Sequence, residues 1–185
     1  MSAADTPKFM ARLALESGIS ALALRFLILT AARSGEVRGA EWSEIDFDQA
    51  VWTIPASRMK AKRQHRVPVS APVLRLLQDA QSRPSPSKSS LIFSNIKGGL
   101  LSDMSLTAVM RRMGVDAVPH GFRSTFRDWV GEHTQYPSDL AEMALAHVLP
   151  NKTEAAYRRG DALEKRRDMM DAWALHCLPS YAHGR

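Results

Sequence analysis

Apolar residues recur through most of the chain at the three-to-four-residue spacing of an α-helix. This spacing predicts helical segments over residues 7–16, 21–32, 36–40, 73–80, 102–113, 120–133, 138–146 and 161–176. The first is expected to begin at Thr6-Pro7, with Thr6 as the N-cap. The segment 21–32 is apolar on nearly every face, which is typical of a helix in the middle of a core.

Three short stretches between the helical segments show a different pattern. Residues 44–47, 51–54 and 66–69 are rich in β-branched and aromatic side chains and are separated by a turn and by a long basic loop. They predict a small three-stranded antiparallel sheet in the N-terminal third of the chain. The expected fold class is therefore mainly α (α+β), with residues 1–185 forming a single domain.

Composition narrows the class of protein. The chain has 185 residues, of which 45% are apolar and 24% charged, values that are ordinary for a globular domain. We find no uncharged apolar stretch long enough for a membrane span and no pattern of a signal peptide. The single cysteine, Cys177, excludes an internal disulfide and a multi-cysteine zinc site. These features predict a cytoplasmic protein without a membrane partner.

The positive charge is concentrated in one part of the chain. The net charge is +6, and the residues between Asp48 and Asp103 hold nine bases and only one acid, Asp79. Such a stretch indicates either a polyanion partner or a solvated charged surface, and charge alone does not separate the two. Five bases within residues 58–66 favour nucleic acid.

Several common classes of enzyme lack support in the sequence. The six histidines include no H-E-x-x-H motif, and neither a Gly-rich phosphate loop nor a G-x-S-x-G elbow is present. We therefore expect no metal and no cofactor. What remains is a scatter of basic side chains and one tyrosine, namely Arg33, Lys60, His120, Arg123, His147 and Tyr157. Singly, each has an ordinary structural explanation, such as a helix-terminal cation or a half-buried aromatic ring.

Together and in this order, these residues resemble the catalytic domain of the tyrosine site-specific recombinases. The sequence looks closest to the prophage and genomic-island branch of the phage-type integrases. The resemblance rests on TAARSGEVRGAEW, which holds Arg33 and Glu36, and on SRMKAKRQHRVPVS, PHGFRSTFRDW and ALAHVLPNKTEAAY. Many family members carry Gly just before the first arginine, where this chain has Ala31-Ala32.

The resemblance implies DNA strand exchange through a 3′-phosphotyrosyl intermediate. Tyr157 would be the nucleophile, and Lys60 the general acid for the leaving 5′-oxygen. Two guanidiniums suit the charge that develops on the non-bridging oxygens, and two imidazoles would add donors. The residues that would fill these roles are Arg33, Arg123, His120 and His147. Glu36 would act as a partner that orients a catalytic cation.

The same resemblance predicts partners and domain organisation. Double-stranded DNA at attachment sites, other protomers in a DNA-bound tetramer and accessory DNA-bending proteins are the expected partners, in the nucleoid. The bases expected to contact backbone phosphates are Arg58, Lys62, Arg63 and Arg66. The chain is expected to be the C-terminal catalytic domain, without the upstream core-binding and arm-binding domains. Two alternatives are a type IB topoisomerase-like enzyme and a non-catalytic DNA-binding remnant of a mobile element.

Overall fold

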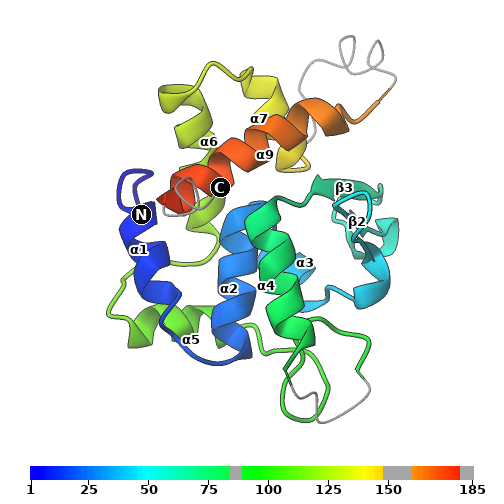
Figure 1. Ribbon diagram of the computed structural model, residues 1–185, viewed down its shortest axis with the longest axis vertical. Coiled ribbons are helices and arrows are strands. Elements are labelled where there is room, and N and C mark those ends of the chain that lie inside the picture. The colour runs from blue at the N-terminus through cyan, green and yellow to red at the C-terminus, as the bar shows by residue number, and fades with distance from the viewer. Residues whose placement is uncertain (84–88, 148–159, 180–185) are drawn as a thin grey trace.

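The computed structural model describes residues 1–83, 89–147 and 160–179 of the chain (Figure 1). It is mostly helical with one small sheet, which confirms the predicted fold class. The α-helices of this described part are α1 Thr6–Leu13, α2 Ile19–Thr30, α3 Ser34–Arg38, α4 Ala71–Gln81, α5 Ser105–Arg112, α6 Gly121–His133, α7 Ser138–Ala144 and α9 Leu163–Cys177. None of the described helices is long and apolar enough to cross a membrane.

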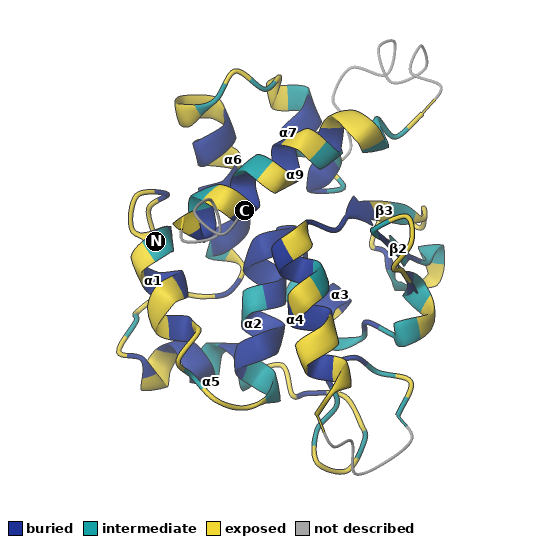
Figure 2. Ribbon diagram, viewed as in Figure 1, coloured by how far each residue is buried: buried dark blue, intermediate teal, exposed yellow. Residues whose placement is uncertain are grey.

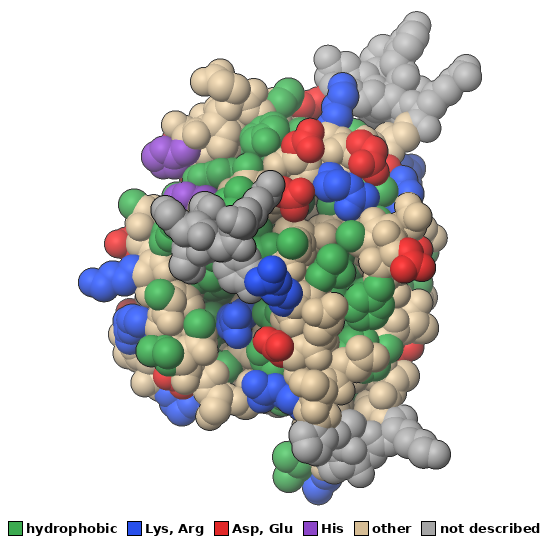
Figure 3. All heavy atoms as spheres, in the orientation of Figure 1, with side chains coloured by type: hydrophobic (Ala, Val, Ile, Leu, Met, Phe, Trp, Pro, Cys, Tyr) green, Lys and Arg blue, Asp and Glu red, His purple; other side chains and the backbone are tan. Residues whose placement is uncertain are grey.

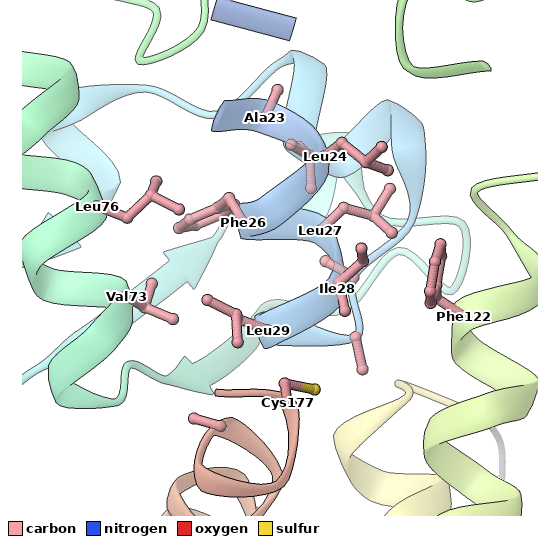
Figure 4. Close-up of a cluster of buried hydrophobic side chains, with 14 of the residues drawn as sticks. Ala23, Leu24, Phe26, Leu27, Ile28, Leu29, Val73, Leu76, Phe122 and Cys177 are labelled. Atoms are coloured by element: carbon pink, nitrogen blue, oxygen red, sulfur yellow. The ribbon is translucent and has the colours of Figure 1, made fainter. Parts of the chain in front are cut away.

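Helix α2 is the centre of the core, as its apolar sequence predicts. It contacts α1, α3, α4, α5 and α9, and its ribbon is buried along most of its length (Figure 2). Figure 4 shows its side chains among Val73 and Leu76 of α4, Phe122 of α6 and Cys177 of α9. The helix ends at Ala31, whose backbone is left-handed with φ 51°. This turn releases the chain from the core just before Arg33.

The sheet has the predicted antiparallel order β1-β2-β3, with β1 at Ile45–Asp46, β2 at Val51–Ile54 and β3 at His65–Pro68. Ile54 pairs with His65, so residues 55–64 form the connection between β2 and β3. This connection includes the short 3-10 helix η2, Ala56–Arg58, and a second one, η1 at Trp42–Glu44, precedes β1. Trp52 joins the sheet to the core through an edge-on ring contact with Phe26, whose centroid is 5.0 Å away.

Helices α6, α7 and α9 form a second group beside the α2 core (Figure 1). The predicted apolar side of α6 is confirmed, because Phe126 and Trp129 pack on Trp173 of α9. Helix α9 also contacts β3, α7 and α1. This arrangement brings the end of α7 next to the loop that follows α2.

Some predicted boundaries are wrong by a few residues. Helix α1 begins at Thr6 itself, with Asp5 as its N-cap, and the Thr6 hydroxyl donates to the Ser2 carbonyl. It ends at Leu13 rather than near Glu16, because the backbone N–H groups of Leu15 and Glu16 bond to the carbonyls three residues back, as in a 3-10 turn. Helix ends are set by capping and exposure as much as by periodicity.

Candidate active site

Arg33 and Glu36 lie at the start of α3 and are bound to each other. The Glu36 carboxylate accepts hydrogen bonds from the Arg33 backbone N–H at 2.8 Å and from Arg33 Nη1 at 2.7 Å. Arg33 is the N-cap of α3, and Glu36 is only 5% exposed. The short loop after α2 and this double contact therefore fix the direction of the Arg33 guanidinium.

Arg123 projects from α6 into a buried position behind Arg33. Its Nη1 donates to the Ala31 carbonyl at 2.6 Å, and its Nη2 donates to the Leu145 carbonyl at 2.6 Å. Burial, with the nearby charge of Arg33 as the next cause, lowers the pKa of Arg123 to about 10. The guanidinium thus stays charged at neutral pH, and the left-handed Ala31 presents one of the carbonyls that hold it.

The C-terminal end of α7 is the point at which these basic groups meet. The carbonyl of Leu145 accepts from Arg123 Nη2 and also from Arg33 Nη2, at 3.4 Å. The last carbonyls of a helix have no partner within the helix and carry partial negative charge. Two guanidiniums that would otherwise repel each other are therefore held side by side by one backbone oxygen.

His147 follows α7 and completes this cluster. Its Nε2 lies 3.1 Å from Arg123 Nη2, and its Nδ1 lies 2.6 Å from Glu142 Oε2. The second Glu142 oxygen, Oε1, accepts from Arg127 Nε at 2.5 Å. Burial raises the pKa of Glu142, but the hydrogen bonds from His147 and Arg127 outweigh it and lower that pKa overall. Glu142 is therefore an ionised carboxylate at neutral pH.

His65, at the start of β3, connects the sheet to the same helix end. Its Nε2 lies 3.1 Å from the carbonyl of Ala144, the residue before Leu145. Burial, followed by the charge of Arg166, lowers the pKa of His65 to about 4. The ring is neutral at pH 7, so Nε2 carries a hydrogen and donates it to Ala144.

The connection between β2 and β3 carries the exposed bases. Lys60, Lys62 and Arg63 all lie in solvent, and Lys62 has a left-handed φ of 53°. Arg58 is different, since its Nε and Nη2 bind the Glu44 carboxylate at 3.0 and 2.5 Å while Nη1 donates to the Glu36 carbonyl. Arg58 therefore braces η1 against α3.

Arg66 is also engaged within the chain. Its Nε and Nη2 bind the two carboxylate oxygens of Asp161 at 2.8 and 2.7 Å. The buried Arg166 adds bonds to the Arg66 and Asp161 carbonyls, so β3 is joined to the start of α9. Figure 3 shows the face that carries α4 and α9, on which charged side chains of both signs are interspersed. The DNA contacts expected of Arg58 and Arg66 stay predictions.

The structure thus brings together four of the residues singled out from the sequence, namely Arg33, Glu36, Arg123 and His147. His120 is the N-cap of α6 and is exposed, although its neighbour on the helix, Arg123, is buried. Within the described residues, no hydrogen bond ties the side chain of His120 or Lys60 to this cluster. Tyr157 lies outside the described residues.

Sequence reasoning missed three residues that bind the predicted ones or the end of α7. Glu142 binds His147, His65 binds the Ala144 carbonyl, and Asp161, outside the cluster, forms an ion pair with Arg66. An acid five residues before a histidine that ends a helix was a visible signal for Glu142. His65 had no comparable signal, because its partner is a backbone carbonyl 79 residues away. Among the described residues, we find no group of three His, Cys, Asp or Glu side chains that could hold a metal ion.

Comparison with known proteins identifies the family. The family model described as "Phage integrase family" matches residues 1–164. The chain is 40% identical over 151 residues to the prophage integrase IntA of Escherichia coli K12, covering 80% of this chain and 36% of that protein. It is 34% identical over 180 residues to the integrase of Shigella phage Sf6, covering 94% of this chain and 46% of that protein. The chain belongs to the phage integrase family.

Solved structures share the fold. A lambda integrase (75–356) dimer bound to a COC′ core site superposes with a TM-score of 0.58 and 17% identity, over 87% of this chain and 59% of that chain. The XerH recombinase in its pre-cleavage complex with difH superposes with a TM-score of 0.65 and 16% identity, over 86% and 50%. The chain spans less than half the length of the two curated integrases that it matches.

Proposed function

We propose that this chain is the catalytic part of a site-specific DNA recombinase that cleaves and rejoins DNA through a 3′-phosphotyrosyl intermediate. The observation that carries the proposal is the convergence of Arg33, Arg123 and His147 on the carbonyl end of α7. Arg33 and Arg123 lie 90 residues apart in the sequence, and His147 lies 24 residues further on. Together they present two fixed positive charges beside an imidazole. Such a preorganised group is suited to a phosphodiester whose oxygens gain charge in the transition state.

The chemistry assigned to these residues is as follows. The Tyr157 hydroxyl gives its proton to solvent water and attacks phosphorus, which joins the 3′ side of the cleaved strand to the tyrosine and releases the 5′-oxygen. Lys60 gives that oxygen a proton. Before DNA binds, three of the five N–H groups on Arg123 serve Ala31, Leu145 and His147, so at least two are left for a phosphate oxygen. Rejoining reverses these steps with a different 5′-hydroxyl.

The exposed bases of the hairpin and the guanidiniums of the cluster favour double-stranded DNA as the partner. Lys62 and Arg63 would contact backbone phosphates of double-stranded DNA. Other protomers in a DNA-bound tetramer and accessory DNA-bending proteins would be the further partners. We further propose that cleavage needs no metal, because two permanent cations supply the positive charge that a divalent ion would provide. Both curated relatives described above are integrases, so the topoisomerase alternative is not favoured.

Suicide substrates test the proposal directly. Nicked duplexes carrying candidate attachment sites should give a protein–DNA adduct that survives SDS, equally in Mg²⁺ and in excess EDTA. Tyr157→Phe should abolish the adduct and keep DNA binding, since only a hydroxyl is lost. The matched variant Tyr136→Phe should still form it. Adduct from Tyr157→Phe, or none from the parent protein at any site, would overturn the proposal.

A further inference from the structure

Glu142 is the acidic member of a chain of contacts that runs through the cluster. Its two oxygens bind Arg127 Nε of α6 and His147 Nδ1, and the other ring nitrogen of His147 faces Arg123 Nη2. Glu142 has 22% of its side chain exposed, against 63% for Arg127. The carboxylate is therefore more buried than either of its two partners, because the His147 side chain is 41% exposed.

The ring nitrogen of His147 that carries the hydrogen can be assigned from the groups that each nitrogen contacts. A guanidinium only donates, so the 3.1 Å contact with Arg123 requires a lone pair on His147 Nε2. Nδ1 then carries the hydrogen and donates it to Glu142 across 2.6 Å. The opposite tautomer would set the Nδ1 lone pair against an ionised carboxylate. Glu142 therefore holds the ring in a single orientation and a single tautomer.

In the proposed reaction, on which the role of Glu142 depends, this tautomer limits what His147 can donate to DNA. A neutral ring with hydrogen on Nδ1 has nothing to donate from Nε2 to a phosphate oxygen. It can donate only after taking up a proton at Nε2, which makes it an imidazolium. Arg123 and Arg33, on α6 and α3, oppose that added charge, and Arg127 partly neutralises the carboxylate that favours it.

We propose that Glu142 is a positioning residue that fixes the His147 ring and supports its protonation, so that Nε2–H can donate to the scissile phosphate. The proton comes from solvent when DNA binds, and the phosphate replaces His147 as the partner of Arg123 Nη2. The ion pair between Glu142 and the imidazolium offsets the repulsion from the two guanidiniums. The role is analogous to that of any carboxylate that orients a catalytic imidazole, without contact with the reacting atoms.

The test uses Glu142→Gln, which keeps the shape and an acceptor oxygen but removes the charge. The matched control is Glu132→Gln, which removes a 73%-exposed carboxylate from α6. Nitrogen NMR of the DNA-free proteins should show the Nδ1–H tautomer of His147. Protonation of the ring should move to lower pH by about one unit in Glu142→Gln and stay unchanged in the control. Arg127→Gln should move it in the opposite direction.

Single-turnover cleavage of the suicide substrate gives the second readout. Glu142→Gln should lose up to about tenfold in rate on the alkaline side of the pH profile and progressively less as the pH falls, since one pH unit of protonation corresponds to a tenfold population. Identical ring titration in Glu142→Gln and Glu132→Gln would overturn the inference, as would a rate loss that is equal at all pH values. If the parent protein forms no adduct, the proposed function fails, while the NMR titration still decides the role of Glu142.

Discussion

The guanidinium cluster at the end of α7 and the hairpin between β2 and β3 are both basic, yet the chain holds them in opposite ways. Arg123 is 4% exposed and makes three hydrogen bonds, two of them to backbone carbonyls. Lys60, Lys62 and Arg63 lie in solvent on a connecting loop. Groups that stabilise charge gain from being fixed before the substrate arrives, because they then need no reorganisation during the reaction. A proton donor and phosphate contacts can be supplied by side chains that adjust on binding.

The largest effect should come from Arg123→Lys. The charge remains, but a lysine lacks the planar fork that serves Ala31, Leu145 and His147 together. We expect a cleavage loss of roughly 10³-fold and a stability loss of about 2–3 kcal/mol from unsatisfied buried carbonyls. Suicide-substrate kinetics and urea unfolding measure both. The exposed Arg112→Lys on α5 is the control, and equal behaviour of the two variants would remove the distinction between buried and exposed bases.

Lys60→Ala should separate catalysis from stability. Cleavage should fall by about 10²-fold or more, since the leaving oxygen lacks its proton, while the free energy of unfolding changes by less than about 0.5 kcal/mol. A substrate with a 5′-bridging sulfur should restore the rate, because a thiolate leaves without a proton. Arg123→Lys should not be restored in this way. If both variants were rescued, or neither, the general acid would be another base of the hairpin.

His65 makes the junction between the two regions sensitive to acid. Its pKa in the folded protein is about 4, below the ordinary 6.5, so the unfolded chain takes up the proton first as the pH falls. Stability is therefore lost as the pH falls from about 6.5 towards 4. Between pH 7 and pH 5 the loss should be about 1–2 kcal/mol. Urea unfolding of the parent against His65→Gln, which keeps an N–H donor without titrating, checks this; parallel pH curves would contradict it.

The smallest effect should come from removing Lys62 and Arg63 together. Replacing both by Ala should weaken DNA binding several-fold at low salt and reduce the slope of log affinity against log salt by about two. Stability should not change, because both side chains lie in solvent. Titrations at three salt concentrations measure the slope. Replacing Arg111 and Arg112 of α5 by Ala provides the control, and an equal slope change there would mean that the hairpin has no special place at the DNA.

Some parts of the candidate site could be predicted from the sequence and others could not. The order of Arg33, His120, Arg123 and His147 was legible, and so was the helix that holds Arg123, since Phe122, Phe126 and Trp129 repeat at helical spacing. The ion pairs of Arg58 with Glu44 and of Arg66 with Asp161 could not be predicted, because their members are 14 and 95 residues apart, respectively. The sequence does not distinguish the bases of this run from one another. In the folded protein some of them form ion pairs within the chain, and others stay exposed to solvent.

The sequence by itself determined the local elements, namely the apolar α2, the three strands and the amphipathic α6, because hydrophobic periodicity acts over a few neighbouring residues. Only the tertiary structure decided which groups meet. The packing of α6 and α7 beside the end of α2 sets the carbonyls of Ala31 and Leu145 around one guanidinium, and it makes Arg123 buried while His120, three residues earlier, stays exposed. Backbone carbonyls are present at every residue and carry no sequence signal, so a site built on them is specified only when distant segments pack together.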